Sequence, residues 1–202
     1  TFSIWGVIYI FLGVYVFKTV FTQNQDILNT FQEPVMIVFI LSSLFNMIWL
    51  FLWHYDYILL STVVMIILFL TLMYGYLQIP NDYLVIKTPF SLYTAWISIA
   101  LIANVTITLV KYKFNGFNIK PEYILIAILT IGTIIGLLTI ILMHDVVFGA
   151  VFLWAYSGIL VKHIVEYKMK YTAAIYALAT FMIIIGGTLI YQLIQNGFTI
   201  YG

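Results

Sequence analysis

Seven apolar stretches fill most of this chain, and each is long enough to cross a lipid bilayer as a helix. A spanning helix needs about 20 mostly apolar residues. Only 7% of the 202 residues are charged, whereas a soluble domain carries roughly 25%. The sequence therefore predicts an all-α integral membrane protein, a polytopic helix bundle with seven transmembrane helices in the lipid bilayer. The predicted spans are 2–20, 34–53, 57–77, 90–110, 122–143, 146–164 and 172–194.

Composition removes several classes of function. The chain has no cysteine and a net charge of +1, so we expect no thiolate site and no electrostatic attraction to nucleic acid. Three scattered histidines without a carboxylate inside a span do not predict a metal site, a catalytic residue or a required cofactor. Two His/Asp pairs fall in predicted tight turns and His163 in a predicted basic loop, where such residues normally form wet polar caps. The pairs are His54 with Asp56 and His144 with Asp145.

Lysine placement predicts which side of the membrane each loop faces. Six of the eight lysines fall on the side that holds the 54–56 turn and the loops at 111–122 and 162–171. Cytoplasmic loops carry an excess of Lys and Arg. We therefore predict that these loops are cytoplasmic and that Gly202 is external. The chain opens at Thr1 without a Met or a basic leader, which indicates a fragment whose beginning is missing.

Three of the predicted helices carry aromatic and amide side chains along one face. Residues three or four positions apart lie on the same side of a helix. An amide facing hydrocarbon is costly, so such a face should point at protein, water or a ligand. Flat rings beside small residues and a few amides suit a cavity for a flat, largely apolar small molecule. The candidate ligand-binding residues are Trp5, Tyr9, Asn46, Trp49, Trp53, Tyr93, Trp96 and Asn104.

A plainer interpretation of the same side chains stays open. Amides join helices through interhelical hydrogen bonds that average well under ~1 kcal/mol in membranes, and the rings would then fill core space. Small residues also recur in the last three predicted helices, as at Gly132, Gly136 and Gly186–Gly187. They allow close helix packing, either within the chain or between two copies in a homodimer, and their spacing does not choose between the two.

Three segments, taken together, resemble the TspO/MBR family, the tryptophan-rich sensory proteins related to the mitochondrial translocator protein. They read TFSIWGVIYIFLG, SSLFNMIWLFLWHY and PFSLYTAWISIALIANVT, in this order. The resemblance covers residues 1–110 and implies the last four of the five family helices. Residues 111–202 then look like the three-helix membrane extension of a longer bacterial branch, which implies a bacterial plasma membrane.

The resemblance also implies a pocket for porphyrins and other hydrophobic aromatic molecules, lined by two tryptophans and nearby polar side chains. Trp5, Tyr9 and Asn46 match family motif positions, as do Trp96 and Asn104. The expected function is that of a membrane receptor or binding protein for such a molecule, tetrapyrroles favoured, with a sensory or trafficking role. A small-molecule transporter and a porphyrin-degrading enzyme are the alternatives, although the sequence offers only tryptophans for such degradation.

The predicted orientation can be tested by cysteine accessibility, because the native chain has no cysteine. A single cysteine introduced at position 113 should react with a membrane-impermeant thiol reagent only after the inner face of the membrane is opened. One introduced at Gly202 should react in intact cells. Labelling of position 113 from outside intact cells would reverse the assignment.

Overall fold

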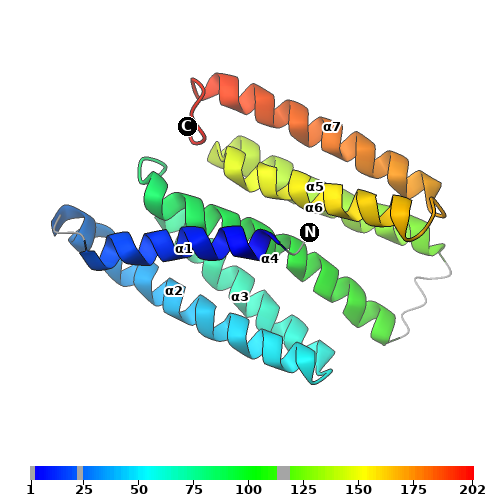
Figure 1. Ribbon diagram of the computed structural model, residues 1–202, viewed down its shortest axis with the longest axis horizontal. Coiled ribbons are helices and arrows are strands. Elements are labelled where there is room, and N and C mark those ends of the chain that lie inside the picture. The colour runs from blue at the N-terminus through cyan, green and yellow to red at the C-terminus, as the bar shows by residue number, and fades with distance from the viewer. Residues whose placement is uncertain (1–2, 22–24, 113–118) are drawn as a thin grey trace. The chain divides into compact units, whose positions relative to one another are not determined.

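The computed structural model describes residues 3–21, 25–112 and 119–202, with only the backbone described at 25–33 and 121. Lys113, which the lysine count includes, lies outside these ranges. The described chain contains seven α-helices long and apolar enough to cross a membrane, so the predicted all-α polytopic fold is confirmed (Figure 1). The helices are α1 (Ile4–Phe21), α2 (Gln25–His54), α3 (Ile58–Gln78), α4 (Leu84–Lys111), α5 (Pro121–Met143), α6 (Val146–Val165) and α7 (Thr172–Gln195).

Two helices begin earlier than their prolines predict. Pro34 lies inside α2 and Pro89 lies inside α4, although the predicted spans begin at 34 and 90, at or just after these prolines. A proline within a helix leaves one carbonyl of the preceding turn without its N–H partner. Membrane helices tolerate this because neighbouring helices, side chains and water satisfy the freed carbonyl. The predicted loops at 22–34 and 78–89 are correspondingly shorter than the sequence suggests.

The chain folds as two compact units. The N-terminal unit, residues 2–108, contains α1, α2, α3 and nearly all of α4. The C-terminal unit, residues 109–202, contains α5, α6 and α7.

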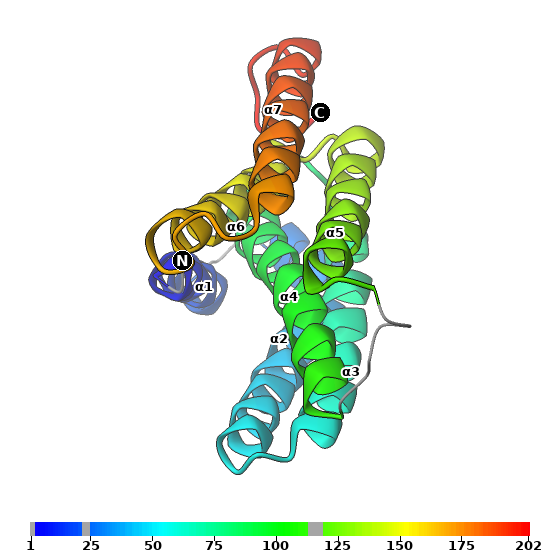
Figure 2. The same cartoon turned by 90° about the vertical axis from the view of Figure 1, so that its right-hand side faces the viewer.

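In the N-terminal unit, α2 packs closely against α3 while α1 diverges from α2 (Figures 1 and 2). Gly75 of α3 allows the close packing, because a Cβ there would lie 2.6 Å from a methyl carbon of Val38. Tyr15 holds α1 in place near the point of divergence. Its ring meets Phe39 of α2 and Phe90 of α4 edge-on, with centroids 5.7 and 5.6 Å away. Tyr15 therefore links α1 to both α2 and α4.

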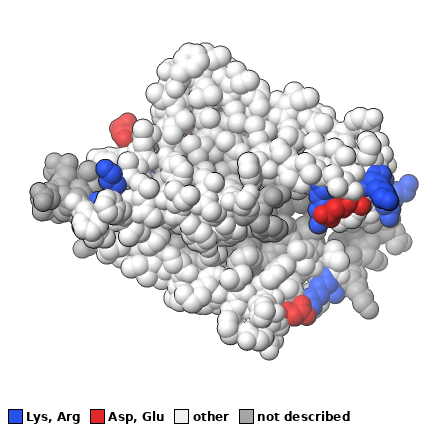
Figure 3. Space-filling model, in the orientation of Figure 1, with Lys and Arg blue, Asp and Glu red and all other residues white. Residues whose placement is uncertain are grey.

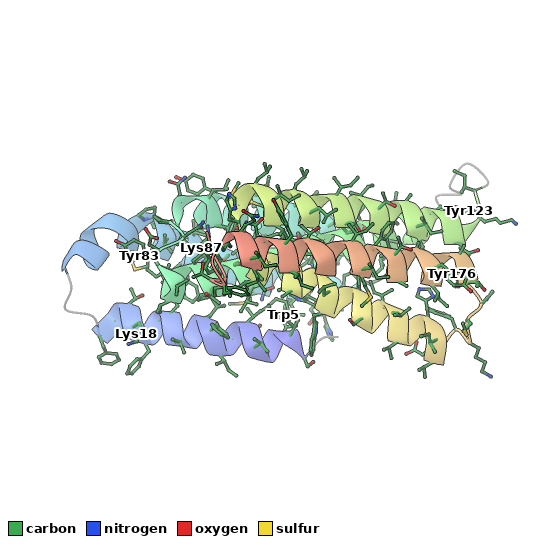
Figure 4. All side chains as sticks on the ribbon, turned by 90° about the horizontal axis from the view of Figure 1, so that it is seen from above. Trp5, Lys18, Tyr83, Lys87, Tyr123 and Tyr176 are labelled. Atoms are coloured by element: carbon green, nitrogen blue, oxygen red, sulfur yellow. The ribbon has the colours of Figure 1, made fainter. Side chains whose placement is uncertain are left out.

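A buried lysine joins α3 to α4. Lys87 precedes the predicted span 90–110 and is therefore expected in a loop, but its side chain is only 3% exposed and the residue lies within α4 (labelled in Figure 4). Its Nζ donates hydrogen bonds to the carbonyl oxygens of Tyr76, at 3.0 Å, and Ile79, at 2.9 Å. It also lies 3.8 Å from the centroid of the Tyr76 ring. Because the last carbonyls of a helix form the negative end of its dipole, they can hold a cation away from water.

Each of the three helices of the C-terminal unit packs against the other two (Figure 2), and polar side chains join them. The Tyr156 hydroxyl of α6 donates to the carbonyl oxygen of Leu129 in α5, at 2.8 Å, and lies 3.1 Å from the Thr133 hydroxyl. At the start of α7, the carboxylate of Glu122 accepts the backbone N–H of Ala173 at 2.7 Å. A carboxylate from α5 thus satisfies the N-terminus of α7, where negative charge is favoured.

The turn between α5 and α6 is shielded from water, so the expectation of a wet turn was wrong for Asp145. Its side chain is 0% exposed and accepts a backbone N–H at 2.9 Å as the N-cap of α6. His144 Nδ1 lies 2.6 Å from Nε2 of Gln192, a buried amide on α7. The end of the chain folds back over this turn, and Val146 N donates to Ile200 O at 3.1 Å. The polar cap predicted for this turn is present, but the chain terminus covers it.

The other two histidines differ in their surroundings. His54 and Asp56 are exposed. His163 does not lie in a loop as predicted, because α6 continues through it to Val165, and its side chain is only 6% exposed. Its ring packs against Tyr167 and Tyr171, with centroids 5.1 and 5.8 Å away. The aromatic residues that follow α6 therefore cover this histidine.

Two glycines of the C-terminal unit provide a matched test of close packing. A Cβ at Gly149 would lie 2.5 Å from Ile140 and 2.6 Å from Leu189, whereas one at Gly187 would meet nothing within 4 Å. We expect Gly149→Ala to lower the free energy of unfolding by about 1–3 kcal/mol through overpacking. Gly187→Ala should leave it unchanged or raise it by up to about 1 kcal/mol, because alanine favours the helix. Reversible unfolding in mixed micelles measures both, and equal effects would contradict the packing.

Candidate ligand-binding site

Four aromatic rings from α1 and α4 meet in the N-terminal unit. Trp5 and Tyr9 are one turn apart on α1, and their rings stack with centroids 5.5 Å apart. Tyr93 and Trp96 lie on the facing side of α4. The Trp5 ring meets Tyr93 at 5.8 Å and Trp96 at 6.4 Å, edge-on in both contacts. Four of the eight residues predicted from sequence therefore form one cluster, which we call the ring cluster.

The ring cluster has a covered side and an open side. Tyr93 and Trp96 are buried, at 3% and 4% exposure, and the side chain of Trp5 is half-buried. Tyr9 is 57% exposed. Edge-to-face contacts of this kind hold aromatic rings at preferred angles. Contacts with α4 thus fix the orientation of the Trp5 ring, while the Tyr9 ring is exposed on the surface of α1.

An open groove of about 590 Å³ continues from Tyr9 between α1 and α2. Apart from the Tyr9 and Ser43 hydroxyls, its lining side chains are apolar. At Gly13 the groove is open, because a Cβ built there would meet no atom within 4 Å. Of the residues that line the groove, only Tyr9 was predicted from the sequence. The α1 residues after Tyr9 nevertheless repeat at three- and four-residue spacing, which is the signal of a single helix face. The groove is lined by Tyr9, Leu12, Gly13, Val16, Phe17, Val20, Phe21, Phe39 and Ser43.

The stripe predicted on α2 also forms, with two buried polar atoms left unpaired. The rings of Trp49 and Trp53 lie 6.2 Å apart. The Asn46 amide oxygen and the Trp49 indole nitrogen are both buried, and neither has a hydrogen-bond partner among the described residues. Most buried polar atoms in proteins are paired. These two atoms are therefore available to a water or to a polar group of a ligand.

Asn104, predicted on the same grounds, is engaged between helices. Its side-chain oxygen accepts a hydrogen bond from the Thr62 hydroxyl at 2.9 Å, and its amide nitrogen lies 3.5 Å from the Met65 sulfur. Thr62 also lies 2.6 Å from the Thr108 hydroxyl. This amide follows the plainer interpretation, in which polar side chains join membrane helices. Its role as a ligand contact stays a prediction.

A second groove, of about 420 Å³, lies at the other end of α1 from Trp5. Figure 4 shows Lys18 and Tyr83 at this end of the N-terminal unit. The groove mixes charged and apolar side chains, and sequence analysis predicted none of them as a site. It is lined by Tyr15, Lys18, Thr19, Asp82, Tyr83, Leu84, Val85 and Ile86.

The fold and the ring cluster define a class: an integral membrane helix bundle with an aromatic-rich cluster beside an apolar groove. Within that class the chain belongs to the TSPO-like protein family, whose model matches residues 1–190. The matched range extends beyond residues 1–110, on which the sequence resemblance rests, and reaches well into the C-terminal unit. The division into a family part and an extension stays a prediction. Comparison with curated proteins and with solved structures gave no match.

The interhelical role of Asn104 can be measured with a double-mutant cycle. Asn104→Leu and Thr62→Val should each destabilise the N-terminal unit, with a coupling free energy of roughly 0.6–1.7 kcal/mol, because they remove the same hydrogen bond. Unfolding of the two single variants and the double variant in mixed micelles gives the coupling. Zero coupling, together with loss of ligand affinity in Asn104→Leu, would instead make Asn104 a ligand contact.

Proposed function

We propose that the N-terminal unit binds a flat, hydrophobic aromatic small molecule, with tetrapyrroles the favoured class. The observation that carries the proposal is the Trp5 ring, held edge-on by Tyr93 and Trp96 and stacked on Tyr9. Three of the rings are at least half-buried, and the fourth faces an apolar groove. A planar ligand gains most from such ring faces. Membership of the TSPO-like family supports the same class of ligand.

The proposed ligand lies along α1 with its aromatic plane against Tyr9 and its apolar substituents in the groove. The groove's volume, about 590 Å³, falls within the range of small-molecule sites, which is roughly 300–1,000 Å³. The polar groups that line the groove are the hydroxyls of Tyr9 and Ser43. The unpaired Asn46 oxygen and Trp49 nitrogen lie further along the same helix as Ser43 and are not among the groove's lining residues. Binding of this kind requires no cofactor and suits a sensory or trafficking role in a cell membrane, for which we favour the bacterial plasma membrane.

The proposal predicts that aromatic substitutions in the ring cluster weaken binding of protoporphyrin IX to the purified protein. Trp5→Phe and Trp96→Phe should each reduce affinity, by less than about tenfold, since the smaller phenyl ring keeps part of a contact that adds roughly 0.5–1.5 kcal/mol beyond buried area. Trp154→Phe, a half-exposed tryptophan on α6 in the C-terminal unit, is the matched control and should leave affinity unchanged. The shift of the porphyrin absorption band measures binding independently of the tryptophans removed.

A second pair of variants separates blockage of the groove from loss of stability. Gly13 and Gly187 are both helical glycines at which a Cβ would meet no atom within 4 Å. Gly13→Phe should fill the groove and weaken porphyrin binding, whereas Gly187→Phe should not. Equal losses in the two variants, or in Trp5→Phe and Trp154→Phe, would exclude the ring cluster as the site. Bleaching of the bound porphyrin by the unmodified protein would indicate degradation in place of binding alone.

A further inference from the structure

The C-terminal unit carries a charged surface that the proposed function does not use. Residues 162–171, which we call the basic turn, comprise the last turn of α6 and the segment that connects it to α7, and they contain Lys162, Lys168 and Lys170. All three lysines are exposed, as is Lys120, the N-cap of α5 at the same end of the bundle. Figure 3 shows positive side chains gathered at the end where α6 meets α7.

The acidic groups at this end are already engaged. Glu122 accepts the N–H groups of Ala173 and Ala174 at the start of α7, at 2.7 and 3.3 Å. Glu166 lies 3.8 Å from Lys162. The remaining acid among the described residues of the C-terminal unit is Asp145, which lies at the opposite end of α6. The described part of this end is therefore positively charged, because its four lysines outnumber its two carboxylates.

The basic turn is a folded structure. Backbone hydrogen bonds close it at several points, including Met169 N to His163 O at 3.1 Å and Lys170 N to Tyr167 O at 2.9 Å. Lys168 and Met169 adopt left-handed backbone angles, with φ of 46° and 60°. Beneath the turn, the rings of Tyr167 and Tyr171 enclose the buried His163. The lysines are thus carried on a fixed platform, so less conformational entropy is lost when they bind.

Exposed tyrosines lie near the basic turn, as is typical of the depth where membrane and water meet. Tyr123 of α5 and Tyr176 of α7 lie near the same end of the C-terminal unit in Figure 4, and both are more than half exposed. Tyr167 is also partly exposed. Tyrosine favours the headgroup region because its ring is apolar and its hydroxyl is polar. The lysines next to these rings therefore lie where the phosphates of the surrounding lipids are found.

We propose that the basic turn, with Lys120, binds the headgroups of anionic phospholipids. The charge complementarity is direct, since four exposed lysines outnumber the two carboxylates at this end. Clusters of basic residues immediately next to a membrane helix attract anionic lipid, and the attraction grows with each added charge. The lysine bias predicts that this end faces the cytoplasm, where the negative surface potential of a membrane is found. The site is separate from the ring cluster and does not depend on what the ring cluster binds.

The test uses a fluorescent reporter on the full chain. Met169 is half exposed at the tip of the basic turn, and the chain has no cysteine, so Met169→Cys can carry a single solvatochromic label. Short-chain phosphatidylglycerol added to the protein in neutral detergent should produce a saturable spectral shift. Phosphatidylcholine of the same chain length should bind far more weakly. Raising the salt from about 0.15 to about 0.5 M should weaken phosphatidylglycerol binding, because screening shortens the reach of the charges.

Lysine variants locate the site. Lys162→Gln, Lys168→Gln and Lys170→Gln should each weaken phosphatidylglycerol binding by about fivefold, and the three changes together should lower it further. Lys18→Gln removes an exposed lysine from the N-terminal unit and should change nothing. If the triple variant does not fold, the single variants decide. Equal binding of phosphatidylcholine, unchanged affinity in the lysine variants, or equal binding of free glycerol phosphate would overturn the proposal.

Discussion

The cost of leaving a polar group unpaired in hydrocarbon is the constraint on which this structure depends. Helices satisfy their own backbone groups except at their ends, where four N–H and four C=O groups lack partners. Charged side chains complete several of these ends. Lys87 donates to the last carbonyls of α3, Glu122 accepts from the first N–H groups of α7, and Asp145 is the N-cap of α6. In each case the side-chain charge is opposite in sign to the end of the helix dipole that it contacts, and this attraction allows the charge to be buried or shielded near a membrane.

The same constraint separates two asparagines that look alike in sequence. Asn104 has its oxygen and nitrogen engaged by α3, so its amide is accounted for by helix packing. The oxygen of Asn46 is buried without a partner among the described residues, and the indole nitrogen of Trp49 shares this state. Spacing treats both asparagines as members of aromatic stripes. Only the neighbouring helix distinguishes an amide that joins helices from one that is free to bind.

The sequence predicts much of this fold and part of its site from two simple properties. The length of the apolar stretches predicts the seven spans, and helix spacing places Trp5 with Tyr9 and Tyr93 with Trp96 on single helix faces. That these two faces meet does not follow from spacing, since α1 and α4 are far apart in the chain. Lys87 and Asp145 were misjudged for a related reason. Their partners are helix ends and a chain terminus that periodicity does not bring together.

A ligand in the proposed site has already left water when it dissolves in the bilayer, and this determines which contacts give affinity. The exposed side chains that line the groove, such as Phe17, Val20 and Phe21, lie within the apolar span of α1. Moving an apolar surface from lipid into an apolar groove gains little, because lipid tails are as apolar as the groove itself. Preference for one ligand must then come from ring geometry and from pairing of polar atoms. The rings around Trp5 would supply the first kind of contact to the proposed ligand, and the hydroxyls of Tyr9 and Ser43 are the polar groups on the groove itself, whereas its apolar walls mainly define the shape that fits.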